Sequence, residues 1–145
     1  MSSGDKLPKY LVVAALTVAF GVWIWQLAAP SGTSKGRTVN VKVPKLSVLA
    51  TNGKAAFDAN CAQCHGLNAA GSDKGPPLVH NVYNSGHHSD GAFFVAAKIG
   101  VRQHHWPYGD MPPQPRTDEV QLTAIVQYVR ELQVANGISY RPHRM

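Results

Sequence analysis

The sequence predicts an all-α fold, in which a small domain of three main helices follows a single transmembrane helix. Three features support this prediction. A charge-free apolar run of twenty residues lies near the N-terminus, and three later segments carry apolar residues at helical spacing. The chain of 145 residues contains 13 Gly and 10 Pro, so long loops are expected between the helices. At this length one folded domain with an appendage is expected, and a large multidomain enzyme is excluded.

The net charge of +6 is concentrated in the N-terminal third of the chain. Residues 1–47 carry six Lys and Arg against one Asp, a net charge of +5, whereas residues 48–145 carry eight against seven, a net charge of +1. Proteins that bind nucleic acids place their positive charge on the domain that contacts the phosphates. Because the predicted domain is nearly neutral, nucleic-acid binding is not expected.

The first predicted helix is the apolar run of residues 10–29, which contains no charged side chain. A helix of this length spans roughly 30 Å, the thickness of a bilayer's hydrocarbon core, and Trp23 and Trp25 suit a membrane interface. A cleaved signal peptide is the alternative, but the run is longer than a typical signal core and lacks the small residues expected before a cleavage site. We therefore predict a retained anchor in the lipid bilayer, preceded by a short N-terminal segment of residues 1–9.

Residues 30–47 are predicted to form a linker between the anchor and the domain. The linker opens with a stretch rich in Ser and Gly, and the segment Val39 to Val43 then alternates apolar and polar residues, as an extended strand does. Pro44 ends this alternation. A stiff solvated spacer and a segment that docks on a partner's surface or sheet edge both fit the pattern.

The domain is expected over residues 48–138, with a tail of residues 139–145. Its three predicted helices cover residues 54–63, 90–99 and 118–135. Phe57 faces inward in the first helix. Ser89 is the candidate N-cap of the second helix, and Gly100 ends it. Thr117 precedes the third helix, whose apolar residues recur at spacings of three and four, as on a buried helix face: Leu122, Ile125, Val126, Val129 and Leu132.

The motif Cys61-Ala62-Gln63-Cys64-His65 has the C-x-x-C-H pattern of haem c attachment. Two thiols about one helical turn apart can each add to one vinyl group of the porphyrin, and His65 then falls beneath the iron. A thioredoxin-like redox pair would need a surrounding βαβ pattern, which is missing. A zinc site would need four ligands, which two Cys and scattered His supply only awkwardly. One haem c, covalently bound through Cys61 and Cys64, is therefore predicted, with His65 as an iron ligand.

Met111 is the predicted second axial ligand of the iron. The other two methionines are the first and last residues of the chain, whereas Met111 lies in a loop before the last predicted helix. The two prolines that follow it fix φ and stiffen this loop, which keeps a weak thioether ligand in place. His104 or His105 is the competing ligand, and Met111 would then be an ordinary buried residue.

These features together resemble the class I c-type cytochromes, in a membrane-anchored bacterial monohaem form, over about residues 50–137. The stretch Gly53 to Phe57 is similar to the first helix of that family, whose Gly and aromatic residue cross the last helix. Ile125 and Tyr128 occupy the positions expected to receive this crossing. Met111 followed by Pro fits the bacterial form of the axial-ligand loop. The resemblance implies the small class I fold of three main helices around haem.

The resemblance also assigns roles to residues around the haem. Residues 75–78, Gly-Pro-Pro-Leu, are similar to the family's Gly-Pro-x-Leu, in which the Pro carbonyl accepts a hydrogen bond from the ligating His. Pro76 is therefore expected to set the tautomer of His65, and Leu78 is expected at the haem. Three aromatic residues are expected either to donate hydrogen bonds to the haem propionates or to wall the pocket: Tyr83, Trp106 and Tyr108.

The sequence departs from the family pattern in its histidines. Five of them lie in the two loops that flank the haem: His80, His87, His88, His104 and His105. Solvated loop residues and propionate partners are the expected roles. A second metal site such as copper, or a pH-sensitive contact with a partner, is the alternative.

The resemblance implies an electron carrier rather than an enzyme, with no small-molecule substrate at the metal. Because haem attachment in this family occurs outside the bacterial inner membrane, the haem domain is expected in the periplasm and residues 1–9 in the cytoplasm. A nearly neutral domain favours confinement by the anchor over electrostatic steering. The expected partners are membrane redox complexes, such as a quinol:cytochrome c reductase and a terminal oxidase. A permanently bound haem subunit of one oxidoreductase complex, and a haem sensor or peroxidase-like enzyme, are the alternatives.

Overall fold

The computed structural model describes residues 7–28 and 37–142, with side chains described for residues 10–26 of the first range. The chain divides into two compact units, Met1–Thr33 and Ser34–Met145. Every named element of the described residues is helical, and extended backbone is paired only at an isolated bridge between Val101 and Met111. The predicted all-α fold is confirmed.

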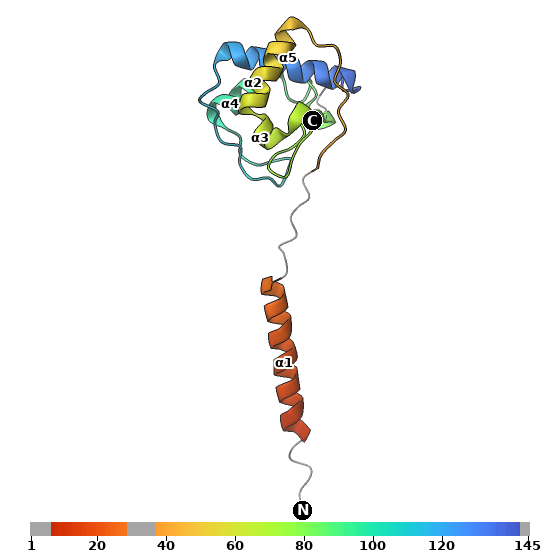
Figure 1. The fold of residues 1–145 in the computed structure, drawn as a ribbon, viewed down its shortest axis with the longest axis vertical. Helices are drawn as coiled ribbons and strands as arrows, with labels where there is room; N and C mark the ends of the chain where they lie inside the picture. Colours follow the sequence, from red (N-terminus) through yellow and green to blue (C-terminus); the bar gives the residue numbers. More distant parts are fainter. Residues whose placement is uncertain (1–6, 29–36, 143–145) are drawn as a thin grey trace, which may run out of the picture. The chain divides into compact units, whose positions relative to one another are not determined.

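Helix α1, Leu7–Ala28, is the element of the first unit (Figure 1). Its side chains from Tyr10 to Gln26 are all exposed. In the part of the chain that the structure describes, no helix is both long and apolar enough to cross a membrane. The anchor over residues 10–29 therefore stays a prediction, and Ala29 and residues 1–6 lie outside the described residues.

The second unit contains four α-helices and two short 3₁₀ helices within its described residues. They are α2 (Val48–Asn60), α3 (Ala62–His65), η1 (Leu67–Ala69), η2 (Asn81–Tyr83), α4 (Asp90–Ile99) and α5 (Glu119–Ala135). The apolar stripe predicted on the last helix is buried at all five of its positions, with at most 6% of any of these residues exposed. This stripe forms one side of the hydrophobic core.

Helices α2 and α5 cross within this core (Figure 1). Their backbones approach so closely that a Cβ atom on Gly53 would lie 1.9 Å from the carbonyl oxygen of Ala124, so only glycine fits there. One turn further on, the fully buried rings of Phe57 and Tyr128 meet edge to face, with their centroids 5.6 Å apart. The crossing expected from the family resemblance is confirmed.

The predicted ends differ from the observed ends in two of the three helices. Helix α2 begins six residues earlier than predicted, because the Ser47 hydroxyl accepts the backbone N–H of Ala50 at 3.2 Å and caps the helix. It also ends before Cys61, where the short helix α3 takes over. Helix α5 is capped by Asp118, not Thr117. The side chains of Asp118 and Gln121 each accept the other's backbone N–H, which forms a capping box.

Helix α4 has the predicted bounds and ends before Gly100. Ser89 lies at the N-cap position in an extended conformation, but its side chain makes no capping hydrogen bond.

The linker predicted for residues 30–47 is corrected for its second part. Residues 37–47 are held against the domain by hydrogen bonds, from the N–H of Val39 to the Ala70 carbonyl at 2.8 Å and between the Asn136 side chain and both backbone groups of Lys42. Three half-buried side chains pack on the core: Val39, Val41 and Leu46. Of the alternating valines, Val39 and Val41 thus face the chain's own domain, whereas Val43 is exposed. Residues 30–36 lie outside the described residues.

The predicted C-terminal tail also belongs to the domain as far as it is described. The Asn84 amide oxygen accepts the backbone N–H of Arg141 at 3.2 Å. The two segments pass so closely that a Cβ atom on Gly86 would lie 1.9 Å from the Arg141 carbonyl oxygen. Residues 139–142 therefore run against the loop that follows η2, and residues 143–145 lie outside the described residues.

Candidate functional site

The C-x-x-C-H motif begins at the end of α2 and forms the short helix α3. The N–H of Cys61 donates to the Phe57 carbonyl at 2.8 Å, and the N–H of His65 donates to the Cys61 carbonyl at 2.9 Å. These bonds continue helical geometry through the motif, so the motif is built directly on the packed helix α2. Cys61 is half-buried and Cys64 is exposed.

The orientation of the His65 ring is fixed by Pro76. The Nδ1 atom of His65 lies 2.9 Å from the Pro76 carbonyl oxygen. Because a carbonyl only accepts, Nδ1 carries the hydrogen and Nε2 keeps its lone pair. Burial lowers the pKa of His65, and the bond to Pro76 opposes this shift in part. The ring is therefore a neutral imidazole whose Nε2 can bind a metal ion.

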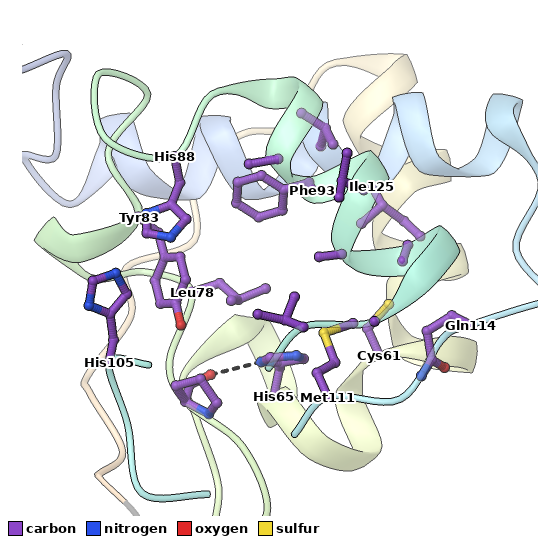
Figure 2. Close-up of a pocket in the computed structure, with 18 of the residues that line it drawn as sticks. Cys61, His65, Leu78, Tyr83, His88, Phe93, His105, Met111, Gln114 and Ile125 are labelled. Carbon is purple, nitrogen blue, oxygen red and sulfur yellow. Dashed lines mark hydrogen bonds between the residues drawn. The ribbon is translucent and has the colours of Figure 1, made fainter. Parts of the chain in front are cut away.

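A cavity of about 720 Å³ opens above His65. Figure 2 shows Phe93 and Ile125 on one side of this cavity and His65 with Met111 on the other. The lining is largely apolar. Eight of the nine predicted site residues line it: Cys61, His65, Pro76, Leu78, Tyr83, Trp106, Tyr108 and Met111. The ninth, Cys64, lies outside this lining.

Met111 reaches the cavity from the loop between α4 and α5, and an antiparallel bridge holds it there. Its N–H donates to the Val101 carbonyl at 2.8 Å, and the N–H of Val101 donates back at 2.9 Å. Gly100 turns the chain into this bridge with φ of +81°, and a Cβ atom on it would lie 2.5 Å from the Met111 carbonyl oxygen. Sequence reasoning identified the prolines after Met111 but missed this bridge.

The two cysteines have no disulfide bond in the structure. Burial, with a smaller contribution from Cys64, raises the pKa of the Cys61 thiol to about 11. A thiol–disulfide redox centre needs the opposite shift, because the thiolate is the reactive species. The environment of Cys61 thus disfavours the alternative of a thioredoxin-like pair.

Comparison with known families identifies the group to which this site belongs. The family model described as Cytochrome c matches residues 50–133, more than half of the chain. The chain belongs to the cytochrome c family. Neither curated proteins nor solved structures give a match. Its cofactor is haem c, bound covalently through Cys61 and Cys64, and its domain is an electron-transfer domain.

The residues present fit this cofactor. A neutral His with a free Nε2 and a Met thioether are axial ligands of haem iron, and His65 and Met111 line one cavity whose volume lies in the range of cofactor pockets. The buried indole N–H of Trp106 interacts with the Tyr83 hydroxyl but meets no acceptor at good hydrogen-bond geometry among the described residues. Because buried donors are rarely left unpaired, this N–H is available to a polar group of the ligand, such as a propionate.

The other two aromatic residues of the predicted site differ in their surroundings. Burial raises the pKa of Tyr83 to about 12, although the Trp106 indole N–H opposes this shift in part, so the hydroxyl stays protonated and able to donate. The Tyr108 hydroxyl accepts the backbone N–H of Arg37 at 2.9 Å, which connects the cavity wall to the segment 37–47.

Sequence reasoning missed two polar residues of α5 that hold the loop after Leu78 in place. The Arg130 guanidinium donates to the backbone carbonyls of Tyr83 and His88 at 2.7 and 2.6 Å. The buried Gln133 amide donates to the carbonyls of Leu78 and Tyr83. In the sequence, each of the two is only a polar residue beside the apolar stripe. Such residues are equally common on solvated helix faces, so nothing in the sequence singles them out.

The extra histidines fall into two groups. His80 stands apart, because its Nδ1 accepts the N–H of Val82 and caps η2. The other four lie together at the mouth of the cavity: His87, His88, His104 and His105. Burial, together with neighbouring imidazoles, lowers the pKa values of His88 and His105.

Proposed function

We propose that this protein is a membrane-tethered monohaem cytochrome c that carries single electrons between membrane redox complexes. The observation that carries the proposal is that His65 and Met111 line one cavity beside Cys61. His65 and Met111 would hold the haem iron and leave it no open position for oxygen or peroxide, and a Met ligand would raise its potential. When bound, haem supplies reversible exchange of one electron between its ferric and ferrous states.

The chain's own residues hold and shield the reactive group. Pro76 fixes the His65 ring, and the Val101 bridge fixes the backbone of Met111. The apolar wall that includes Phe93, Leu78 and Ile125 keeps water from the pocket. Fixed ligands and an apolar pocket would limit the rearrangement that accompanies electron transfer.

The membrane part of the proposal rests on the sequence. The charge-free run of residues 10–29 has the length of a bilayer-spanning helix, and residues 48–145 carry a net charge of only +1. Such a domain gains little from electrostatic steering, whereas confinement near its partners raises their effective concentration. We place the haem domain in the bacterial periplasm, and the partners are a quinol:cytochrome c reductase as donor and a terminal oxidase as acceptor.

Replacing Met111 tests the ligand assignment. Met111→Ala should keep haem covalently bound but abolish the far-red sulfur-to-iron charge-transfer band of the ferric protein, because the thioether is lost. The native ferrous protein should not bind CO, whereas the variant should. A band that survives the substitution, or native protein that binds CO readily, would contradict the proposal and favour a sensor or a peroxidase-like enzyme.

The tether is tested by removing it. A protein that begins at Ser34 should keep its haem spectrum but reduce or oxidise membrane partners much more slowly at equal total concentration. Its rate should depend only weakly on salt. A truncated protein that reacts as fast as the full chain would show that confinement has no role.

The second candidate is a permanent haem subunit of one membrane oxidoreductase. Small residues along the apolar run would let a neighbouring helix pack closely: Ala14, Ala15, Ala19 and Gly21. A mobile carrier should migrate alone after mild detergent solubilisation, whereas a fixed subunit should co-migrate with a complex of constant composition.

A further inference from the structure

With His65 and Met111 as the proposed ligands of the haem iron, the histidine cluster at the mouth of the cavity is left without an assigned role. His87 and His88 belong to the loop between η2 and α4, whereas His105 belongs to the loop that carries Met111. Figure 2 shows His88, Tyr83 and His105 on one side of the pocket, away from Cys61. The structure thus brings imidazoles from two separate loops to one place at the edge of the cavity.

The ring nitrogens of these three histidines lie close enough together to meet on one metal ion. One nitrogen from each of His87, His88 and His105 lies within 4.8 Å of the other two. The Nε2 atoms of His87 and His105 are 3.2 Å apart. Two nitrogens bound to one tetrahedral Zn²⁺ at its usual bond length lie about 3.3–3.4 Å apart, so the separation of this pair, which shares a hydrogen bond without the ion, already matches a shared ion.

His88 is oriented as metal-binding histidines usually are. Its Nδ1 lies 2.8 Å from the carbonyl oxygen of Val82, so Nδ1 donates and Nε2 keeps its lone pair. The backbone of this residue is also fixed, because its N–H donates to the Asn84 carbonyl and its carbonyl accepts from Arg130. Two of the three candidate ligands therefore stand on a loop that the core holds in place.

We propose that His87, His88 and His105 bind one divalent transition-metal ion, Zn²⁺ or Cu²⁺, which joins the two loops at the cavity mouth. Imidazole nitrogens favour these ions over Mg²⁺ or Ca²⁺, which prefer oxygen ligands. None of the three rings is buried, so an ion reaches them from solvent. His104 stacks beside His88 but lies outside the group of three. Its Nδ1 lies 2.8 Å from the Arg102 carbonyl oxygen.

The test uses the full-length ferric holoprotein without an affinity tag. Zn²⁺, which does not exchange electrons with haem, is titrated calorimetrically, with Mg²⁺ as the control ion. One Zn²⁺ per chain is expected, together with a rise in the midpoint of thermal unfolding, and Mg²⁺ should give neither effect. Absence of Zn²⁺ binding, or equal binding of Mg²⁺, would overturn the proposal.

Substitutions then locate the site. His87→Gln, His88→Gln and His105→Gln should each weaken Zn²⁺ binding at least about tenfold, whereas the neighbouring control His104→Gln should bind as the native protein does. The haem absorption spectrum shows which variants have folded around haem. Equal losses in His104→Gln and His105→Gln would refute the assignment.

A measurement on the native protein avoids any variant that fails to fold. The electron paramagnetic resonance spectrum of one equivalent of Cu²⁺ should show coupling to imidazole nitrogens. A spectrum with oxygen ligands alone would contradict the site. The proposed metal site does not depend on the proposed function, because its test measures neither electron transfer nor ligation of the haem iron.

Discussion

The two segments that carry the proposed axial ligands, α3 with His65 and the loop with Met111, are held in place by different means. His65 is held by helical hydrogen bonds to residues a few positions away and by Pro76 eleven residues on. Met111 depends on a bridge to Val101 and on the loop's connection to residues 37–47 through Tyr108. The first ligand is placed by local structure, whereas the second is placed by contacts between separate segments. Changes far from the haem should therefore disturb the Met ligand before the His ligand.

The largest effect is expected from removing the covalent attachment beside His65. Cys61→Ser with Cys64→Ser should yield protein without covalent haem and largely unfolded, as judged by the haem stain and by far-ultraviolet circular dichroism. The domain is small, and without haem its cavity of about 720 Å³ is left as an apolar void in the core. Met111→Ala, which keeps both cysteines, is the control. A stable, folded, haem-free double variant would show that α3 does not depend on its cofactor.

The next largest effect is expected from removing residues 37–47. A protein that begins at Val48 loses three half-buried core contacts and the bond from Arg37 to Tyr108. Each half-buried side chain contributes about 1 kcal/mol. The free energy of unfolding, measured in denaturant, should therefore be about 3 kcal/mol lower than that of a protein that begins at Ser34. Its charge-transfer band should weaken while haem stays covalently bound. Equal stability and equal spectra in the two truncated proteins would remove the role of this segment.

A smaller effect is expected from a methyl group placed against the Met111 backbone. Gly100 and Gly109 have φ of +81° and +82°, but only at Gly100 would a Cβ atom meet another residue, the Met111 carbonyl. Both Gly→Ala variants should lose about 1–2 kcal/mol through backbone strain. Gly100→Ala should lose more, and its charge-transfer band should weaken, because the bridge must shift. If the two variants behave alike in unfolding and in spectra, the bridge does not position Met111.

The smallest effect is expected from removing the hydrogen bond between the Glu131 carboxylate and the Ser47 backbone N–H. Hydrogen bonds from the Gln127 side chain and from Ser47 lower the pKa of Glu131 below its usual 4.5. A carboxylate with a lowered pKa adds stability above pH 4.5 and loses it as the pH falls through its folded-state pKa. At neutral pH Glu131→Gln should therefore cost at most about 1 kcal/mol, because solvent screens this exposed group. The difference in unfolding free energy between the variant and the native protein should shrink as the pH is lowered from 7 to 3. A difference that stays constant would show that the Glu131 carboxylate is not the group responsible.

The difference between local structure and contacts between distant segments also separates what the sequence could predict from what it could not. The C-x-x-C-H motif, the bounds of α4 and the apolar stripe of α5 are local patterns, and each was predicted from residues close together in the chain. The crossing of α2 and α5 at Gly53 and Phe57 was predicted only through the family resemblance. The Val101 bridge and the hydrogen bonds of Arg130 were missed, because each joins segments that the sequence does not show to be neighbours.

The sequence by itself determined the chemistry of this protein: two thiols and an imidazole at the spacing that haem c requires, and one internal methionine in a proline-rich loop. These features are set by which residues stand close together in the chain, and this order is fixed before the chain folds. Only the tertiary structure decided that residues 37–47 belong to the domain and that three histidines of two loops share one place. A hydrogen bond or a shared ion between distant segments depends on how the helices pack, because packing sets which loops meet.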